Sequence, residues 1–298
     1  PAHGAAQEVN VIEHELDNGL TLLLVPTPGD PNVAAGWVAK VGSVNERPGI
    51  TGVAHLFEHM MFKGTRTIGT EDITEDLAII QQLDQIKVEL AVEEAQLLVA
   101  HRLGEIDDPN DPEARSSRHL ELLAQFDDLL ARQQEIVVKE DFSRIYTEQG
   151  ASGMNAGTSN DFTLYFIKVQ ANKLELLFWM ESDRLLNPVF REFYSERDVV
   201  HEERRLRTDS TPIGKYQEQF DAMFWGSSPY SWPVVGWPSD LEGMTREEAL
   251  AFFDVYYAPN NIAAALVGDD PRLRGHRGAH FAHHAAEPRA HLVHKESQ

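Results

Sequence analysis

Two histidines and a glutamate lie among large apolar side chains in the stretch AHLFEHMMF, residues 54–62. His55 and His59 are four residues apart, so on a helix both imidazoles lie on one face, within reach of one ion. Glu58 follows His55 by three residues and lies near the same face. The stretch therefore predicts a largely buried helix with one polar face. This polar face could hold a metal ion; the alternative is a pair of hydrogen-bonded histidines near a helix end.

The spacing of these three groups is typical of a catalytic zinc site. Neutral imidazole is a good zinc ligand, and a catalytic zinc has three protein ligands and one open position. Two histidines are one ligand short, and the chain has no Cys, so a carboxylate or another His must complete the set. A carboxylate beside the metal, here Glu58, can take a proton from water and pass it to the leaving amine. The order H-x-x-E-H is the inverted form of the H-E-x-x-H zinc motif.

Charge and composition exclude several classes of protein. A net charge of −22 argues against nucleic acid and anionic membranes as partners. The acidic surface either serves solubility or favours neutral and cationic peptides. No apolar run of about 18 residues occurs, so no membrane span is expected. The missing Cys excludes disulfides without defining the compartment. Because the chain begins with Pro1, we expect either a processed form or a fragment.

Local patterns predict a mixture of strands and helices. Two strand-like runs in residues 8–25 flank Asp17-Asn18-Gly19, and Asn-Gly supplies the pair of positive φ angles of a tight hairpin turn. An apolar run at 33–44 predicts a central strand. The other elements expected are a strand–turn–strand unit at 150–169, helices at 172–186 and 191–208, a helix opened by the capping box Thr245–Glu248, and a core strand at 260–269.

Two segments differ from the rest of the chain. In residues 71–140, Leu83, Leu90 and Leu97 recur every seven residues, and a second helical period follows a Pro-containing break. This pattern predicts an inserted helical hairpin, which we interpret as a structural or partner-binding arm. Residues 271–298 hold six of the 13 histidines and show no period. We expect an irregular or disordered tail, or one foreign to the domain; a metal-binding tail is the alternative.

The surroundings of the motif point to a known family. HLFEHMMFKGT, residues 55–65, closely resembles the motif region of the M16 metallopeptidases, the family of pitrilysin, insulin-degrading enzyme and the mitochondrial processing peptidase. In that family a later helix with the pattern E-R-x-V-x-x-x-E completes the zinc site. Residues 196–203, ERDVVHEE, match it. The resemblance implies one Zn²⁺ per chain, held by His55, His59 and Glu203.

The same resemblance assigns several neighbouring residues. It makes Glu203 the ligand rather than Glu202, and makes Glu196, two helical turns earlier, an acidic residue that supports the ligands. It implies that Glu58 is the general base and then the acid. The step from His59 to Glu203 is longer than is usual in the family, by close to the length of the predicted hairpin.

A second segment carries the resemblance further. Residues 155–159, NAGTS, are similar to the family's Asn-Ala-aromatic-Thr-Ser segment, an edge strand to which substrate adds through main-chain hydrogen bonds. Asn155 and Ala156 would be the substrate contacts. Gly157 replaces the aromatic residue, so the pocket beside it should be wider. The resemblance covers residues 9–268 apart from the hairpin.

These observations predict an α+β fold, a LuxS/MPP-like metallohydrolase half with a mostly antiparallel sheet covered by helices and an inserted long helical hairpin. The expected domain is 8–270, with the hairpin at 71–140 and the tail at 271–298. The expected function is zinc-dependent endopeptidase action on peptides or unfolded protein segments. A LuxS-type lyase is excluded because its third zinc ligand is Cys, and a structural zinc site would fill all four positions with protein ligands.

The resemblance also implies a missing partner. Members of the family resemble a clamshell in which the catalytic half faces a homologous, zinc-free half. We therefore expect a second M16-like half or subunit. The alternative function is a non-catalytic or incomplete peptide-binding subunit that needs this half for activity. By analogy with exported bacterial relatives we expect a periplasmic or otherwise exported location, with a cytoplasmic one as the alternative.

Overall fold

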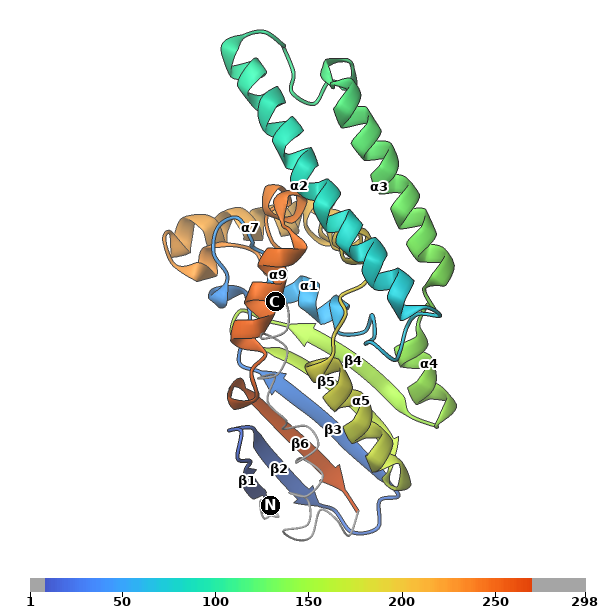
Figure 1. Ribbon diagram of the computed structural model, residues 1–298. Coiled ribbons are helices and arrows are strands. Elements are labelled where there is room, and N and C mark those ends of the chain that lie inside the picture. Colours follow the sequence, from blue (N-terminus) through green and yellow to red (C-terminus); the bar gives the residue numbers. More distant parts are fainter. Residues whose placement is uncertain (1–8, 270–298) are drawn as a thin grey trace.

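The computed structural model describes residues 9–269, which are built on a six-stranded sheet (Figure 1). The strand order is β1-β2-β6-β3-β5-β4, and only the β2–β6 pair is parallel. The strands are β1 (Ile12–Glu15), β2 (Thr21–Pro26), β3 (Asn32–Ala39), β4 (Ser152–Thr158), β5 (Thr163–Gln170) and β6 (Ile262–Gly268). This arrangement confirms the predicted α+β class with a mostly antiparallel sheet. It also leaves β4 at one edge.

Helices, joined by loops and short 3-10 turns, make up much of the rest of the described chain. They are α1 (Val53–Met60), α2 (Ile73–Leu103), α3 (Ser117–Ile136), α4 (Asp141–Glu148), α5 (Leu174–Leu186), α6 (Phe193–Arg204), α7 (Pro212–Trp225), α8 (Pro238–Gly243) and α9 (Arg246–Tyr256). A π-helical turn, Arg205–Asp209, joins α6 to α7. Within residues 9–269 no helix combines the length and apolar character that crossing a bilayer requires.

Helices cover one face of the sheet. Along the central strand β3, Val33, Ala35, Trp37 and Ala39 are buried and alternate with more exposed residues, as expected for side chains that alternate between two faces. Val33 and Ala35 pack in a cluster with α4 and α5. Trp37 and Ala39 pack in a second cluster with α1 and α9. The buried face therefore has two core regions, and α1 belongs to the second.

The hairpin between β1 and β2 differs from the predicted turn. Only Gly19 has a positive φ, +84°, and Asn18 does not. The N–H of Gly19 donates to the carbonyl of Leu16, and the N–H of Leu16 donates to that of Leu20. The loop is thus three residues long and ends in a left-handed glycine, a common alternative to the two-residue turn. The prediction of two positive φ angles was wrong, although the hairpin itself is present.

The segment between α1 and α4 is a long helical hairpin that projects away from the sheet (Figure 1). Leu83 and Leu90 of α2 and Leu122 and Leu129 of α3 are buried in its seam. Its two ends lie side by side, because the N–H of Glu71 donates to the carbonyl of Ile136 at 2.9 Å and that of Val138 to Gly69 at 3.1 Å. The proposed domain limits stay predictions, and the tail at 271–298 lies outside the described residues.

Three helices were missed and one was predicted too long. α4, α7 and α8 were not predicted, and the helix expected at 191–208 ends at Arg204 before the π-helical turn. α7 carries a clear apolar stripe, which includes Ile213, Tyr216, Phe220 and Met223, but all four side chains are more than half exposed. Its period is that of an amphipathic helix.

The N-terminus of α1 is held by a buried glutamate. The N–H groups of Gly52 and Ala54 each donate to the carboxylate of Glu46 at 2.9 Å. Gly52 has φ +90°, and a Cβ there would lie 2.6 Å from the carbonyl oxygen of Val235. Burial raises the pKa of Glu46 to about 8, although the two N–H donors act in the opposite direction. This contact fixes where the helix with both histidines begins.

We predict that Glu46→Gln reduces the pH dependence of stability. The folded-state pKa of about 8 lies above the ordinary value of 4.5, so the folded chain holds a proton that the unfolded chain has lost. This contribution to the free energy of unfolding is fully present below about pH 4.5 and is lost as the pH rises through about 8. Urea unfolding of both chains across this range measures it. An equal slope in the variant would assign the dependence to other groups.

Candidate metal centre and active site

The structure brings His55 and His59 of α1 together with Glu203 of α6. Each offers one ligand atom, and these atoms lie within 4.8 Å of one another. The Nε2 atom of His59 is 3.3 Å from Oε2 of Glu203, and Nε2 of His55 is 3.7 Å from Oε1 of the same carboxylate. Three groups separated by up to 148 positions in the sequence (203 − 55 = 148) thus face one point. Their role as zinc ligands stays a prediction.

The cluster fits a zinc ion in spacing and in donor chemistry. Ligand bonds of about 2.0–2.1 Å in a tetrahedron place donor atoms about 3.3 Å apart, close to the shorter distances in the cluster. Burial, together with the nearby charge of His59, lowers the pKa of His55 to about 4. That imidazole is therefore neutral at physiological pH, the form that binds metal. Arg207 reaches Oε1 of Glu203 at 2.5 Å from the solvent side, a contact that a bound cation would oppose.

His59 is oriented by Glu196, one of the residues predicted from the sequence. The Nδ1 atom of His59 lies 2.9 Å from Oε1 of Glu196. A proton on Nδ1, donated to this carboxylate, leaves Nε2 free for a metal. Burial lowers the pKa of His59, but the hydrogen bond and charge of Glu196 and the charges of Glu203 and Glu58 outweigh it, and the net shift is upward. The predicted supporting role of Glu196 thus has matching geometry.

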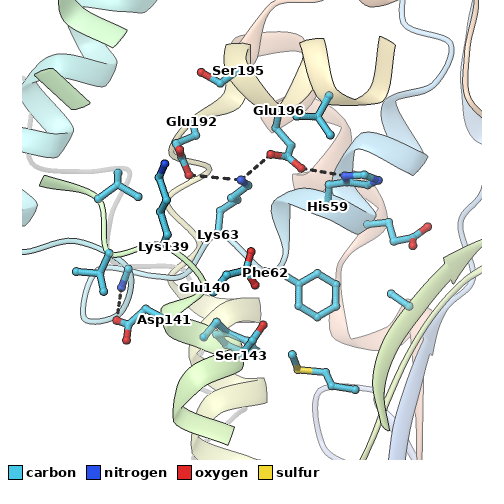
Figure 2. A pocket seen from close by; sticks show the side chains of 18 of the residues that line it. His59, Phe62, Lys63, Lys139, Glu140, Asp141, Ser143, Glu192, Ser195 and Glu196 are labelled. Carbon is cyan, nitrogen blue, oxygen red and sulfur yellow. Dashed lines mark hydrogen bonds and ion pairs between the residues drawn. The ribbon is translucent and has the colours of Figure 1, made fainter. Parts of the chain in front are cut away.

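Lys63 is a further member of this network that sequence reasoning missed (Figure 2). Its Nζ atom lies 2.5 Å from Oε2 of Glu196 and 3.4 Å from Oε2 of Glu192. Burial raises the pKa of Glu196, but its bonds to His59 and Lys63 outweigh that effect and the net shift is downward. Lys63 lies three residues beyond the end of α1 at Met60, so no helical spacing links it to His59, and only its closeness to the motif in the sequence could have pointed to it.

Glu58 lies beside the cluster, and a residue of the sheet holds its carboxylate in place. Its Oε2 atom accepts a hydrogen bond of 2.7 Å from the hydroxyl of Thr158, the last residue of β4. β4 pairs only with β5 among the described strands. Asn155 is exposed and Ala156 is half-buried on this edge strand. Ala156 pairs with Tyr165 of β5 in the register, and its N–H donates to the side chain of Asn155 at 2.9 Å.

A cavity of about 590 Å³ opens between α1, β4, α6 and the chain that leaves the helical hairpin (Figure 2). It reaches Glu58, His59, Asn155 and Ala156. Its charged lining consists of Glu58, Lys63, Lys139, Glu140, Asp141, Glu192 and Glu196. The predicted base, one predicted metal ligand and both predicted substrate contacts therefore border one space.

The neighbours of the predicted ligands lie elsewhere. Glu202 is exposed and pairs with Arg205 at 2.7 Å. The Nε2 atom of His201 lies 3.3 Å from the carbonyl oxygen of Pro238. These partners differ from those of Glu203, the residue that the resemblance to the M16 family selects as the ligand.

Comparison with known proteins finds relatives that are named zinc proteases. The family model described as "Insulinase (Peptidase family M16)" matches residues 21–81. The zinc protease PqqE of Helicobacter pylori is 29% identical over 257 residues, covering 85% of this chain and 42% of that protein. An uncharacterized zinc protease of Mycobacterium leprae, ML0855, is 24% identical over 267 residues, covering 89% of this chain and 44% of that protein.

Solved structures share the fold. A crystal structure of a protease from Helicobacter pylori has a TM-score of 0.63 and 24% identity, covering 93% of this chain and 50% of the other. Pitrilysin has a TM-score of 0.59 and 18% identity, covering 93% of this chain and 22% of the other. At these identities the structural similarity supports the fold alone.

In fold and in sequence, this α+β domain is similar to zinc proteases. The predicted relationship to the M16 metallopeptidases is confirmed. The chain spans less than half the length of the two curated relatives described above.

We predict that Lys63→Met weakens zinc binding by about tenfold, as is typical for residues that orient metal ligands. Without the ammonium group, Oε2 of Glu196 loses its closest cation and the carboxylate no longer holds a fixed position against His59. Titration with zinc against a chromogenic chelator measures the change. Lys63→Arg, which retains the charge, is the control. Equal zinc affinity in Lys63→Met would show that Glu196 needs no second anchor.

Proposed function

We propose that this chain is the catalytic half of a zinc-dependent endopeptidase that hydrolyses peptides or unfolded protein segments. The observation that carries this proposal is the convergence of His55, His59 and Glu203 beside Glu58, on a cavity that reaches an edge strand. The zinc proteases among the relatives support the reaction class. One zinc ion per chain follows from the single cluster of three such ligands found among residues 9–269.

The residues have separate tasks in hydrolysis. When bound, zinc supplies Lewis acidity, which polarises the scissile carbonyl and makes a water molecule easier to deprotonate. Glu58 takes that proton and gives it to the leaving amine. The hydroxyl of Thr158 holds the carboxylate of Glu58 by a 2.7 Å hydrogen bond. Glu196 fixes the ring of His59, and Lys63 fixes Glu196.

β4 provides a means of holding an extended peptide. An exposed edge strand offers main-chain donors and acceptors to an added strand, and this mode of binding is largely independent of sequence. The residues of β4 nearest the cavity, Asn155 and Ala156, would pair with the substrate. A substrate bound there passes Glu58 and can direct side chains into the cavity.

The curated relatives extend well beyond the part that this chain matches, and this bears on whether the chain is active alone. Because this chain spans 42% and 44% of two curated relatives, we propose that a second M16-like half, on the same or another chain, completes the substrate site. The second candidate function is an incomplete peptide-binding subunit that hydrolyses nothing alone. An exported location also stays a proposal.

We predict that Glu58→Gln keeps its zinc and loses at least about 100-fold in cleavage rate, because a positioned base contributes this much. Glu203→Ala should lose most of its zinc, since only two ligands remain. Glu202→Ala, at the exposed neighbouring position, is the matched control and should change neither property. The measurements are metal content after dialysis and cleavage of a quenched unstructured peptide library.

Each result has a distinct meaning. Full turnover by Glu58→Gln would remove Glu58 from the mechanism. Full zinc retention by Glu203→Ala would move the third ligand to another residue. A zinc-loaded parent chain without activity, rescued by a co-expressed second half, would favour the incomplete-subunit function.

We further predict that methylating successive backbone amides of the substrate slows cleavage at every second position only. In an added strand, successive N–H groups point alternately toward and away from the edge. Methylation of an amide that faces β4 should slow cleavage about tenfold, a value close to one lost hydrogen bond. Methylation one residue further along should have little effect. Cleavage rates of a methyl-scanned peptide give the pattern, and a scan with no alternation would exclude strand addition.

A further inference from the structure

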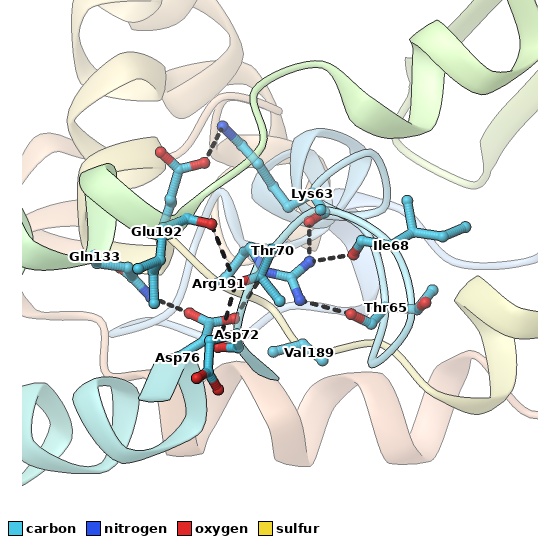
Figure 3. Close-up of polar contacts among 12 residues, drawn as sticks. Lys63, Thr65, Ile68, Thr70, Asp72, Asp76, Gln133, Val189, Arg191 and Glu192 are labelled. Atoms are coloured by element: carbon cyan, nitrogen blue, oxygen red, sulfur yellow. Dashed lines mark hydrogen bonds and ion pairs between the residues drawn. The ribbon is translucent and has the colours of Figure 1, made fainter. Parts of the chain in front are cut away.

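Arg191 is completely buried just before α6, and its guanidinium group contacts two other parts of the chain (Figure 3). Its Nη1 atom donates to the carbonyl oxygens of Lys63 and Ile68, at 2.5 and 2.8 Å. Its Nη2 atom donates to the carbonyl of Thr65 at 2.6 Å, and Nε donates to Oδ2 of Asp76 at 2.9 Å. One side chain thus has four acceptors.

The loop that leaves α1 is built around this guanidinium. Gly64 and Gly69 have φ angles of +90° and +96°, and a Cβ at either position would lie 2.7 Å from Nη1 of Arg191. The N–H of Thr65 closes the loop on the carbonyl of Ile68 at 2.9 Å. The loop therefore has no room for side chains at its two turns while the guanidinium is in place.

The base of the helical hairpin belongs to the same network. Asp76 of α2 is completely buried, and its Oδ1 atom accepts a hydrogen bond of 2.9 Å from Gln133 of α3. Its other oxygen pairs with Arg191. Further along α2, Asp84 accepts a hydrogen bond of 2.9 Å from the hydroxyl of Tyr194 in the first turn of α6. Both hairpin helices therefore connect with the start of α6.

We propose that Arg191 is a positioning residue for the metal centre, which sets α6 against α1. The carbonyl groups that it binds follow directly on the helix with His55 and His59, and its own backbone leads into the helix with Glu203. A buried charge with four partners has one favourable position. The hairpin base, through Asp76, is part of this support. The proposal rests on the proposed zinc site but not on peptide hydrolysis.

Zinc affinity separates positioning from a merely structural role. Arg191→Lys keeps the charge, but a single ammonium nitrogen cannot reach all four acceptors that the guanidinium group of Arg191 binds. We expect zinc binding about tenfold weaker, within the range for residues that orient metal ligands. Arg184→Lys is the matched control, since Arg184 is also buried and pairs with Glu181 in the aromatic cluster under α5. It should lower the melting temperature and leave zinc affinity unchanged.

A double variant tests the cause of the loss. In a Glu203→Ala chain no third ligand is left to position, so adding Arg191→Lys should change the residual zinc affinity by less than about twofold. An equal loss in both backgrounds, or zinc affinity in Arg191→Lys equal to that of the parent, would overturn the proposal. Should Arg191→Lys not fold, Asp76→Asn provides the same comparison.

Amide hydrogen exchange of the metal-free chain gives a second readout that needs no zinc. We expect Arg191→Lys to speed exchange in residues 63–69 and in the first turn of α6. Arg184→Lys, whose parent guanidinium lies over Phe62 outside this segment, should leave both unchanged. Protection equal to the parent at these two segments would also overturn the proposal. If the parent binds no zinc, the proposed function fails, while this measurement still tests Arg191.

Discussion

The approach of α6 to α1 is the contact on which the site depends. It places the carboxylates of Glu196 and Glu203 against two imidazoles, in a region that is largely shielded from water. Clustered carboxylates repel one another, and burial adds a desolvation cost. Lys63 and His59 offset part of that cost in the metal-free chain, and a divalent cation would offset more.

Part of this site could be predicted because its chemistry is local in sequence. The spacing of His55, Glu58 and His59 defines one helical face, whereas Glu196 and Glu203 were identified through the resemblance of residues 196–203 to the M16 family. The central position of β3 and the helical hairpin were predicted from apolar patterns, and the structure has both. In each case the regular spacing of residues within a short segment identifies one face of one helix or strand.

The features that sequence reasoning missed depend on contacts between distant segments. From the sequence alone, Arg191 would be predicted to be an ordinary surface residue, because nothing near it in the sequence reveals its four acceptors. Lys63 lies next to the motif, but its two glutamate partners lie about 130 residues away (192 − 63 = 129; 196 − 63 = 133). The turn at Asn18 was mistaken because a three-residue loop and a two-residue turn accept the same residues. α7 was missed although its apolar period is plain.

The two ends of the helical hairpin lie side by side, so the segments before and after it are close in space although they are far apart in the sequence. Main-chain hydrogen bonds at Glu71 and Val138 close the insertion at its base, so its length can change without moving α1 relative to α6. The number of residues between the segment with His55 and His59 and the segment with Glu203 can therefore change while the distance between these side chains stays the same.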